Sequence, residues 1–576
     1  MKKRRLLLAL LVLPLFALFG CEGDDDASGE STETAPVADA QPPSESDDGS
    51  PFAAFGLDED MRFIEPRTIS VALWERPNDR IPAMAESYWA MWVQDEIYAR
   101  HNIIVEWSVV PRWGPEYTHL GTLFGAGMAP DVSFTFNQGL VTTLGQMDGL
   151  QDLAPLLASY GELLPNLYNL LGEELIYWNL NPTNGELLSI MGRLFQDGRS
   201  LTFIREDWLA ALDLPIPVGL EQFEETLIAF RDNAHLLPGN DGGTVIPYLL
   251  GQDVTWHGGT LFESLVPSDI TDREWFIRSI PGNNNERLMA HEDVIREGSR
   301  ILNRWFNENL LWNDFVIADD HLGGDLITLG QVGAFTGNWD FPFRANPGFI
   351  QGLHQNVGPD ANFIPIMPFL NDVGQVQTFM PAPTDRYIFL PTSNNEQLAS
   401  LLYLDFMSSP DVLDFLQFGY EGVHHEVLEG GAIRTLAEDS ENPWPDNQIF
   451  TVLRNFDIAL TINGIHFTEQ NLDAALATLA LGYPGIAPEA ISHAREMNLR
   501  YGRWFDNVPH GIIASEEGMI APLMDTRDVL LHTVIAGTSP EDFDSVFDQL
   551  YEVYMSTGAR AIMEERTQIW EELFGN

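Results

Sequence analysis

Residues 205–230 read REDWLAALDLPIPVGLEQFEETLIAF, and this stretch has the clearest local pattern in the chain. Apolar side chains recur at helical spacing before and after a turn that Pro215 and Pro217 predict. They are Trp208, Leu209 and Leu212 before the turn, and Phe223, Leu227 and Phe230 after it. We therefore expect two short helices that pack their apolar faces on a core. The pattern identifies a scaffold and not a binding site.

Segments on the N-terminal side of this stretch alternate between strand and helix patterns. Thr68–Leu73, Ile103–Val110 and Asp131–Phe134 read as strands, and Ala83–Arg100 and Tyr117–Phe124 read as helices. Such alternation predicts a mostly parallel sheet covered by helices on both faces. Helical periodicity dominates the rest of the chain, at 220–230, 396–407, 472–479 and 543–574.

The 205–230 block resembles the R-x-D-W-L-x-x-L…P…E-x-F-x-x-x-L-x-A-F pattern of family 1 extracellular solute-binding proteins. The most similar branch is that of the LipO-like lipoproteins, which serve carbohydrate ABC importers. Further segments resemble that branch in the same order: Leu123–Val132, Gly149–Leu153, Gln331–Phe341, Arg386–Phe418, Phe418–His425 and Ile535–Ala561. The resemblance implies an α/β, two-lobed type 2 periplasmic-binding-protein fold, a clamshell with hinge crossovers and a helix-rich second lobe.

We expect the chain to cross between lobes near residues 190, 335 and 400. This gives a first lobe of residues 67–190 plus 336–400, and a second lobe of residues 191–335 plus 401–576.

The N-terminus reads as an export signal. A basic start, Lys2 to Arg5, precedes the apolar run Leu6–Phe19, which is too short for a stable membrane span. Leu18-Phe19-Gly20-Cys21 resembles a bacterial lipobox, which implies removal of the signal peptide 1–20 and lipidation of Cys21. The alternative is an ordinary signal peptide followed by a free buried cysteine. Residues 21–66 begin as a low-complexity acidic run, which predicts a disordered tether. We expect a protein exported to the cell envelope and anchored on its outer face.

Composition narrows the possible partners. The chain has 85 acidic and 30 basic residues, a formal net charge of -55, and no lysine after Lys3. Arginine keeps its charge at higher pH than lysine does, so we expect a saline or alkaline habitat. Nucleic acid is excluded as a partner, because phosphate binding needs a concentrated basic face. A single cysteine excludes a disulfide framework. We expect a monomer.

Candidate ligand-binding residues follow from where ligands bind in open parallel sheets, at the C-terminal ends of strands. Sugars are held by aromatic faces together with polar groups that hydrogen-bond hydroxyls. The residues that fit this description are Trp74, Glu75, Arg76, Trp113, Asn137, Trp256, His257, Trp339, Asp340, Phe341 and Arg386. The alternative for each tryptophan is core packing, and for Arg386 it is an ion pair with a carboxylate.

Metal and catalytic signatures are weak. The loop after Phe230 could hold calcium only through Asp232, Asn240 and Asp241, and it lacks regular oxygen spacing. The adjacent His424 and His425 favour packing over metal binding. No enzyme motif is present, so we expect no catalytic residues and no required cofactor. The predicted function is capture of a carbohydrate, an oligosaccharide, for the permease subunits of an ABC importer. The alternatives are a lipid-anchored polysaccharide-degrading enzyme and a ligand-binding sensor.

Overall fold

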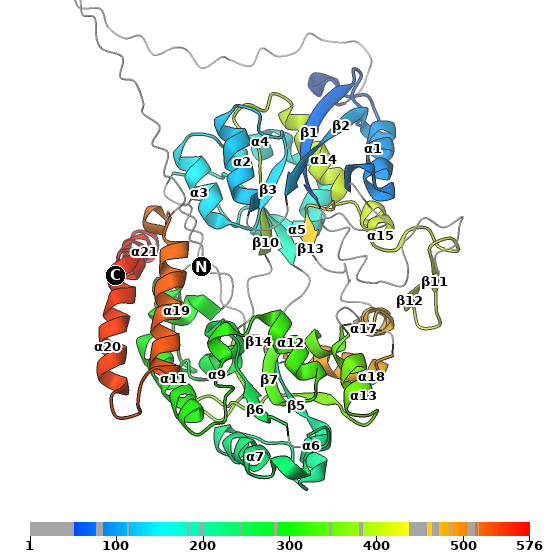
Figure 1. Ribbon diagram of the computed structural model, residues 1–576. Coiled ribbons are helices and arrows are strands. Elements are labelled where there is room, and N and C mark those ends of the chain that lie inside the picture. Colours follow the sequence, from blue (N-terminus) through cyan, green and yellow to red (C-terminus); the bar gives the residue numbers. More distant parts are fainter. Residues whose placement is uncertain are drawn as a thin grey trace, which may run out of the picture.

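The computed structural model describes residues 51–575 with gaps at 76–83, 112–114, 182–183, 195–199, 241–242, 281–284, 345–347, 380–383, 437–457, 464–471, 484, 501, 504–512 and 517. The described chain forms two lobes, each with its own hydrophobic core, drawn one above the other in Figure 1. Cys21, Arg76, Trp113 and Asp241, the signal peptide and most of the predicted tether lie outside the described residues. No helix in the described part of the chain is long and apolar enough to cross a membrane.

The first lobe is built on a sheet of order β13-β4-β10-β3, to which β1 and β2 are joined by a bridge between Val71 and Val132. Its strands are β1 (Arg67–Glu75), β2 (Ile103–Pro111), β3 (Ser133–Thr135), β4 (Ile190–Leu194), β10 (Thr384–Phe389) and β13 (Ile462–Asn463). Its helices are α1 (Tyr88–His101), α2 (Pro115–Gly125), α3 (Gln138–Gln146), α4 (Leu153–Tyr160), α5 (Pro165–Ile176), α14 (Gln397–Met407) and α15 (Pro410–Phe418). A hairpin of β11 (His425–Val427) and β12 (Ile433–Thr435) follows α15.

The second lobe is built on a sheet of order β6-β7-β5-β8. Its strands are β5 (Ser200–Arg205), β6 (Ile246–Leu249), β7 (Val332–Asn338) and β8 (Phe363–Ile366), with a small pair of β9 (Thr378–Phe379) and β14 (Gly502–Arg503). Its helices are α6 (Glu206–Ala211), α7 (Leu220–Asp232), α8 (Val254–His257), α9 (Gly259–Ser264), α10 (Asp272–Arg278), α11 (Glu292–Asn307), α12 (Asp320–Thr328), α13 (Phe349–Asn356), α17 (Leu472–Leu481) and α18 (Pro488–Arg500). The C-terminal helices α19 (Ile520–Ala536), α20 (Phe543–Tyr554) and α21 (Arg560–Phe574) lie along one side of this lobe (Figure 1).

The 205–230 block packs as its pattern predicts. β5 ends at Arg205, α6 follows directly, and α7 begins after the proline turn. Trp208 and the three apolar side chains of α7 (Phe223, Leu227, Phe230) are fully buried in the second core. The Arg205 guanidinium is also fully buried and pairs with Asp207 at 2.7 Å, so the block fixes the end of β5 to the core.

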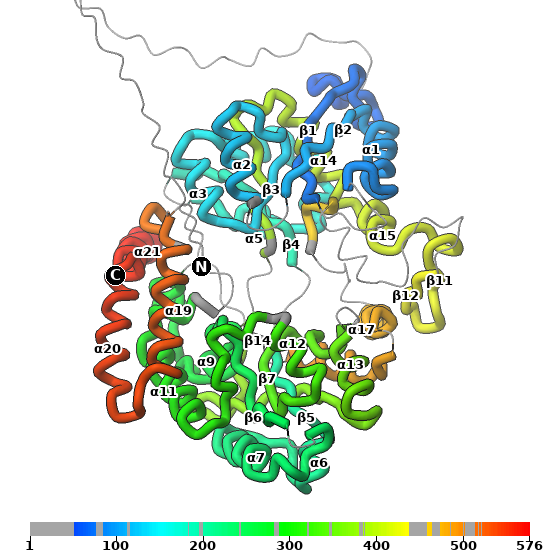
Figure 2. The backbone as a smooth tube through the Cα atoms, viewed as in Figure 1, coloured from blue at the N-terminus to red at the C-terminus, as the bar shows by residue number. Residues whose placement is uncertain are grey.

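Two of the three expected crossings between the lobes fall inside secondary-structure elements, while Figure 2 shows β4 in the first lobe and β5 in the second. β4 ends at Leu194 in the first lobe and β5 begins at Ser200 in the second, while β9 in the second lobe precedes β10 in the first. Residue 335 lies inside β7 and residue 400 inside α14, so neither is a crossing. The predicted boundaries therefore need correction: α13 and β8 pack in the second lobe, and α14, α15 and β13 pack in the first. Pairing of β10 with β3 and β4 is the physical reason, because it carries the following helices back to the first core.

Three of the four strands in each sheet end toward the other lobe, whereas β10 and β5 run the opposite way. β4 leads into the second lobe, and β3, like β4, runs antiparallel to β10, so β3 and β4 end toward that lobe. β5 runs away from the first lobe, and β7 and β8 are antiparallel to it, so their carboxyl ends point back toward the first lobe. β6 is parallel to β7 and shares this direction. The two ligand-binding edges expected of such sheets thus face each other.

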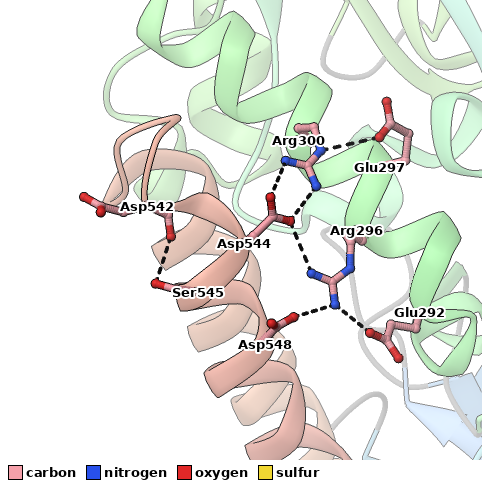
Figure 3. A network of polar contacts seen from close by, with 8 residues as sticks. All are labelled: Glu292, Arg296, Glu297, Arg300, Asp542, Asp544, Ser545 and Asp548. Carbon is pink, nitrogen blue, oxygen red and sulfur yellow. Dashed lines mark hydrogen bonds and ion pairs between the residues drawn. The ribbon is translucent and has the colours of Figure 1, made fainter.

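The C-terminal helices are attached to the second lobe by apolar packing and by a network of charges. Arg296 and Arg300 on α11 pair with Asp544 and Asp548 on α20, at 2.6 to 3.4 Å (Figure 3). The carboxylates are more than half exposed, so solvent screens each pair and its contribution to stability is small. The apolar faces beneath them carry most of the attachment, with Phe543 and Phe547 fully buried.

Candidate functional site

A hollow lies at the carboxyl ends of β6 and β7 in the second lobe, with a volume of about 380 Å³ when its opening to solvent is included. Aromatic and polar side chains share its lining, as expected of a saccharide site. Three predicted residues, Trp256, His257 and Phe341, line it together. The remaining lining residues are Leu249, Gly251, Ala318, Asp319, Gly323, Ile327, Phe335, Thr336 and Gly337.

The short helix α8 presents Trp256 and His257 to this hollow. Asp253 caps the helix: its carboxylate accepts the Trp256 backbone N–H at 3.1 Å and the Thr255 hydroxyl at 2.7 Å. His257 Nδ1 lies 3.0 Å from the Asp253 carbonyl, and because a carbonyl can only accept, Nδ1 carries the proton. The Tyr248 hydroxyl donates to the His257 carbonyl at 2.6 Å.

Gly251 is required by the position of the His257 ring. A Cβ atom at Gly251 would lie 2.5 to 3.0 Å from three atoms of that ring, which is closer than real contacts allow. The glycine therefore lets the imidazole lie against the main chain where β6 ends. Sequence reasoning did not select Gly251, although a Gly-Gln-Asp run directly after a strand is a signal of close backbone approach.

The three predicted residues that follow β7 have different surroundings. Phe341 stacks on Phe349 with centroids 4.7 Å apart and also lines the hollow. Trp339 is 5% exposed and lies with its ring under the guanidinium of Arg495, 5.4 Å away. Its aromatic faces are covered by protein, and the core-packing alternative describes it.

Asp340 is held in an ion-pair and hydrogen-bond cluster. Its carboxylate pairs with Arg344 at 2.7 Å and accepts the Tyr483 hydroxyl at 3.0 Å. Burial, together with the Asp340 charge, raises the pKa of Tyr483, which keeps that phenol protonated as the donor. The cluster joins the segment after β7 to α17 and α18.

A second hollow lies in the first lobe beside the carboxyl end of β3, with a volume of about 410 Å³ when its opening to solvent is included. Amides and hydroxyls dominate its lining, which is suited to the hydroxyl groups of a sugar. The lining residues are Gln138, Val141, Thr142, Asn179, Asn181, Glu186, Leu188, Ser189 and Tyr387. Of these, sequence reasoning reached only Gln138, in the run Phe136-Asn137-Gln138 that follows the predicted strand Asp131–Phe134, and Tyr387 is the neighbour of the predicted Arg386.

Tyr387 connects this hollow to the C-terminal part of the chain. Burial, followed by the nearby carboxylate of Glu516, raises the pKa of its phenol. Glu516 lies in the turn Ala514–Glu516 and forms a buried ion pair with Arg566 of α21 at 2.7 Å. The charge of Glu516, which is paired with a C-terminal helix, is therefore near enough to Tyr387 to favour its protonated phenol.

The other first-lobe candidates are mostly structural in this state. Trp74 is 1% exposed and packs between Phe134 and Phe136, at 5.3 and 4.9 Å. Glu75 accepts the backbone N–H of Met84 at 3.2 Å. The Asn137 side chain caps α3 by accepting the Leu140 N–H at 3.1 Å.

Arg386 is fully buried, with its guanidinium 5.1 Å from the Phe136 ring and donating to the Ile462 carbonyl at 3.2 Å. It also acts on a carboxylate. Burial raises the pKa of Glu116, while the Thr135 hydroxyl, which donates to it at 2.6 Å, and the charge of Arg386 oppose that rise. Arg386, Glu116 and Thr135 are thus buried inside the first lobe and are not exposed on its surface.

Metal-binding geometry is not assembled among the residues that the structure describes. No group of three or more His, Cys, Asp or Glu side chains there could hold an ion. Asp232 pairs with Arg231 at 2.7 Å, and the Asn240 amide donates to the Ala234 carbonyl at 2.6 Å. His424 accepts the Tyr420 N–H at 2.8 Å, and His425 lies 2.9 Å from the Phe418 carbonyl, so both histidines serve packing.

Comparison with known proteins rests on structure. No protein-family model matches the chain, and no curated protein matches it. An alginate-binding protein, AlgQ2 without calcium, superposes with a TM-score of 0.60 at 16% identity, over 88% of this chain and 98% of that one. A human-milk-oligosaccharide (HMO) binding, ABC-transporter-associated solute-binding protein from Bifidobacterium longum infantis gives 0.57 at 16%, over 89% and 100%. The FusA substrate-binding protein of Streptococcus pneumoniae with fructo-nystose gives 0.58 at 14%, over 88% and 99%.

At these identities the similarity establishes the fold. The chain has the two-lobed, type 2 periplasmic-binding-protein fold of these solute-binding proteins, as its sequence predicts.

Proposed function

We propose that this protein is an extracellular solute-binding protein that captures an oligosaccharide for an ABC importer. The observation that carries the proposal is a pair of hollows, one at the carboxyl ends of β6 and β7 in the second lobe and one beside the carboxyl end of β3 in the first. One is lined by the rings of Trp256 and Phe341, and the other by amides and hydroxyls such as those of Gln138 and Asn179. A pyranose offers an apolar C–H face and an edge of hydroxyls, and these linings suit the two. The sugar-binding proteins of the same fold support this assignment.

The charge of the linings favours a neutral saccharide. Glu186 and Asp319 lie in the two linings, and the lining residues that the structure describes include no arginine. Uronates would meet these carboxylates and the net charge of -55. We therefore place neutral oligosaccharides ahead of acidic ones.

Binding without turnover is part of the proposal. Ligand would favour a closed state, since only that state offers contacts from both lobes, and the closed form would dock on the permease. The lipobox resemblance adds anchoring through Cys21, with residues 21–66 as the tether that keeps the lobes near the membrane. The protein is then a monomer on the outer face of the cell membrane.

A thermal-shift screen tests the proposal. Maltotriose, cellotriose, xylotriose and kestose serve as neutral probes, and an alginate trisaccharide serves as the acidic probe. A binder at a hundredfold excess over its Kd stabilises the folded state by about 2.7 kcal/mol, which raises Tm by several degrees. If only non-sugars raised Tm, the substrate class would be wrong. Chromatography of the incubated probes completes the test, because product formation would indicate the enzyme alternative.

A further inference from the structure

The C-terminal helix α19 reaches the helix that carries two residues of the second-lobe hollow. Arg527 of α19 is almost fully buried, its side chain 4% exposed. Its guanidinium lies 3.8 Å from the Asp253 carboxylate and donates to the Thr255 hydroxyl at 3.3 Å. On its own helix it pairs with Asp528 at 2.8 Å. One cation thus joins α19 to the first turn of α8.

Asp253 links Arg527 to two residues that line the hollow. The same Oδ1 atom that faces Arg527 accepts the Trp256 N–H, and the Asp253 carbonyl orients the His257 ring. Removal of the cation would leave the carboxylate free to turn toward solvent and away from the helix end. A continuous run of contacts therefore leads from Trp256 and His257 to a residue about 270 positions later in the chain.

A second contact from α19 fixes the residue before the cap. His532 Nε2 lies 2.8 Å from the Gln252 carbonyl, to which it must donate, and the Gln252 N–H donates to the Ala318 carbonyl at 2.8 Å. Ala318 lines the hollow. Two neighbouring residues, Gln252 and Asp253, are thus both contacted by α19.

We propose that Arg527 is a positioning residue of the saccharide site, and that the C-terminal helices set ligand affinity by holding α8 through Asp253. The proposal rests on the proposed function for its ligand, but the placement of α8 can be measured without any ligand. It assigns to the C-terminal helices a role beyond covering the core of the second lobe.

The variant that tests the proposal is Arg527→Gln, with Arg527→Lys as the conservative change. The fold tolerates the loss of this cation, because Asp253 and Asp528 are 32% and 42% exposed and remain solvated. Arg300→Gln is the matched control. It also removes an arginine that ties the C-terminal helices to the lobe, but through the exposed α11–α20 network (Figure 3) and away from the hollow.

Hydrogen exchange followed by mass spectrometry gives the ligand-free readout. We expect the amides of residues 254–258 to exchange about tenfold faster in Arg527→Gln than in the wild type, while Arg300→Gln leaves them unchanged. Lysine keeps the positive charge but lacks the planar set of guanidinium donors, so the exchange rate of residues 254–258 in Arg527→Lys should lie between those of the wild type and Arg527→Gln. Equal protection of residues 254–258 in all four proteins would overturn the proposal. Loss of protection across the whole lobe would also overturn it, because it would show a role in overall stability only.

Isothermal titration with the tightest neutral saccharide among the four probes gives the second readout. We expect Arg527→Gln to weaken binding about tenfold. We expect the double variant Arg527→Gln/Trp256→Ala to lose less affinity than the product of the losses in the two single variants. A double variant whose loss of affinity equals the product of the two single losses, or an Arg527→Gln variant with unchanged affinity, would contradict positioning through α8. If no probe binds the wild type, the proposed function fails, while the exchange experiment still decides whether Arg527 positions α8.

Discussion

Glu263 provides a test of the second-lobe core through pH. It lies on α9, is 4% exposed, and its carboxyl group accepts the backbone N–H of Phe379, the last residue of β9. Burial raises the pKa of this carboxyl from 4.5 to about 8, although the Phe379 N–H and the charge of Arg287 oppose the rise. The folded protein therefore holds a proton that the unfolded chain releases near pH 4.5.

The sign of the effect follows from this difference in protons. Between pH 4.5 and about 8 the folded state binds one more proton than the unfolded state, so the free energy of unfolding falls as pH rises. The fall is about 1.4 kcal/mol for each pH unit and roughly 5 kcal/mol across the window. Below pH 4.5 the contribution is fully present, and above pH 8 it is lost.

The perturbation is Glu263→Gln, which keeps the shape and the acceptor oxygen but cannot ionise. We expect the variant and the wild type to have similar free energies of unfolding at pH 5, and the variant to be the more stable by roughly 3–5 kcal/mol at pH 8.5. Urea unfolding from pH 5 to 8.5, followed by tryptophan fluorescence, measures the difference. His291 has a pKa lowered to about 4 by burial and adds a rise in stability between pH 4 and 6.5, but both proteins keep it and it cancels.

Glu225→Gln, at an exposed site of α7, controls for the loss of one carboxylate from an acidic chain. Parallel curves for the wild type and Glu263→Gln over the whole range would refute the reasoning, because they would mean that the carboxyl titrates alike in both states. A steeper loss in the variant than in the wild type would refute it as well.

Three further changes have defined outcomes. Gly251→Ala should push the His257 ring away, cost about 1–3 kcal/mol in urea unfolding and weaken saccharide binding in calorimetry; unchanged affinity would show that the ring position is unimportant. Arg566→Leu should cost about 3–5 kcal/mol because Glu516 is left buried without its cation, and Glu516→Leu added to it should recover most of that loss in the same assay. Cys21→Ser should release the protein into the medium on cell fractionation, and an unmodified wild-type N-terminus in mass spectrometry would exclude the anchor.

The fold could be predicted because its signals are local. Each strand or helix after residue 67 is indicated by residues within that element, and so is the apolar spacing of 205–230. The structure has both the alternation of elements and the two packed helices. The lobe boundaries could not be predicted in the same way. They depend on β10 pairing with strands almost 200 residues or more before it, and local sequence does not encode which strands meet.

The site shows how a shift of two residues changes a prediction. The pattern Thr68–Leu73 places Trp74 just beyond a strand, at the ligand edge, whereas β1 continues to Glu75 and takes Trp74 into the core. Trp339 does follow its strand, but α18 brings Arg495 over its ring. Trp256 and His257 do line the hollow, from the short helix α8 that Asp253 caps after the end of β6.

The absence of lysine after Lys3 gains a structural meaning in the interior. Arg205 donates from three nitrogens to both oxygens of Asp207 and to the carbonyls of Gly330 and Pro238, at 2.7 to 3.3 Å. An ammonium group has three donors at one point and cannot reach four acceptors spread around a plane, so lysine here would leave buried acceptors unpaired. Arg527, Arg566 and Arg386 are buried in the same manner and each joins distant segments. The expected export to saline or alkaline water would favour arginine on the surface. In the core, the planar guanidinium is what lets single side chains join the C-terminal helices, the second-lobe hollow and the first-lobe sheet to distant parts of the chain.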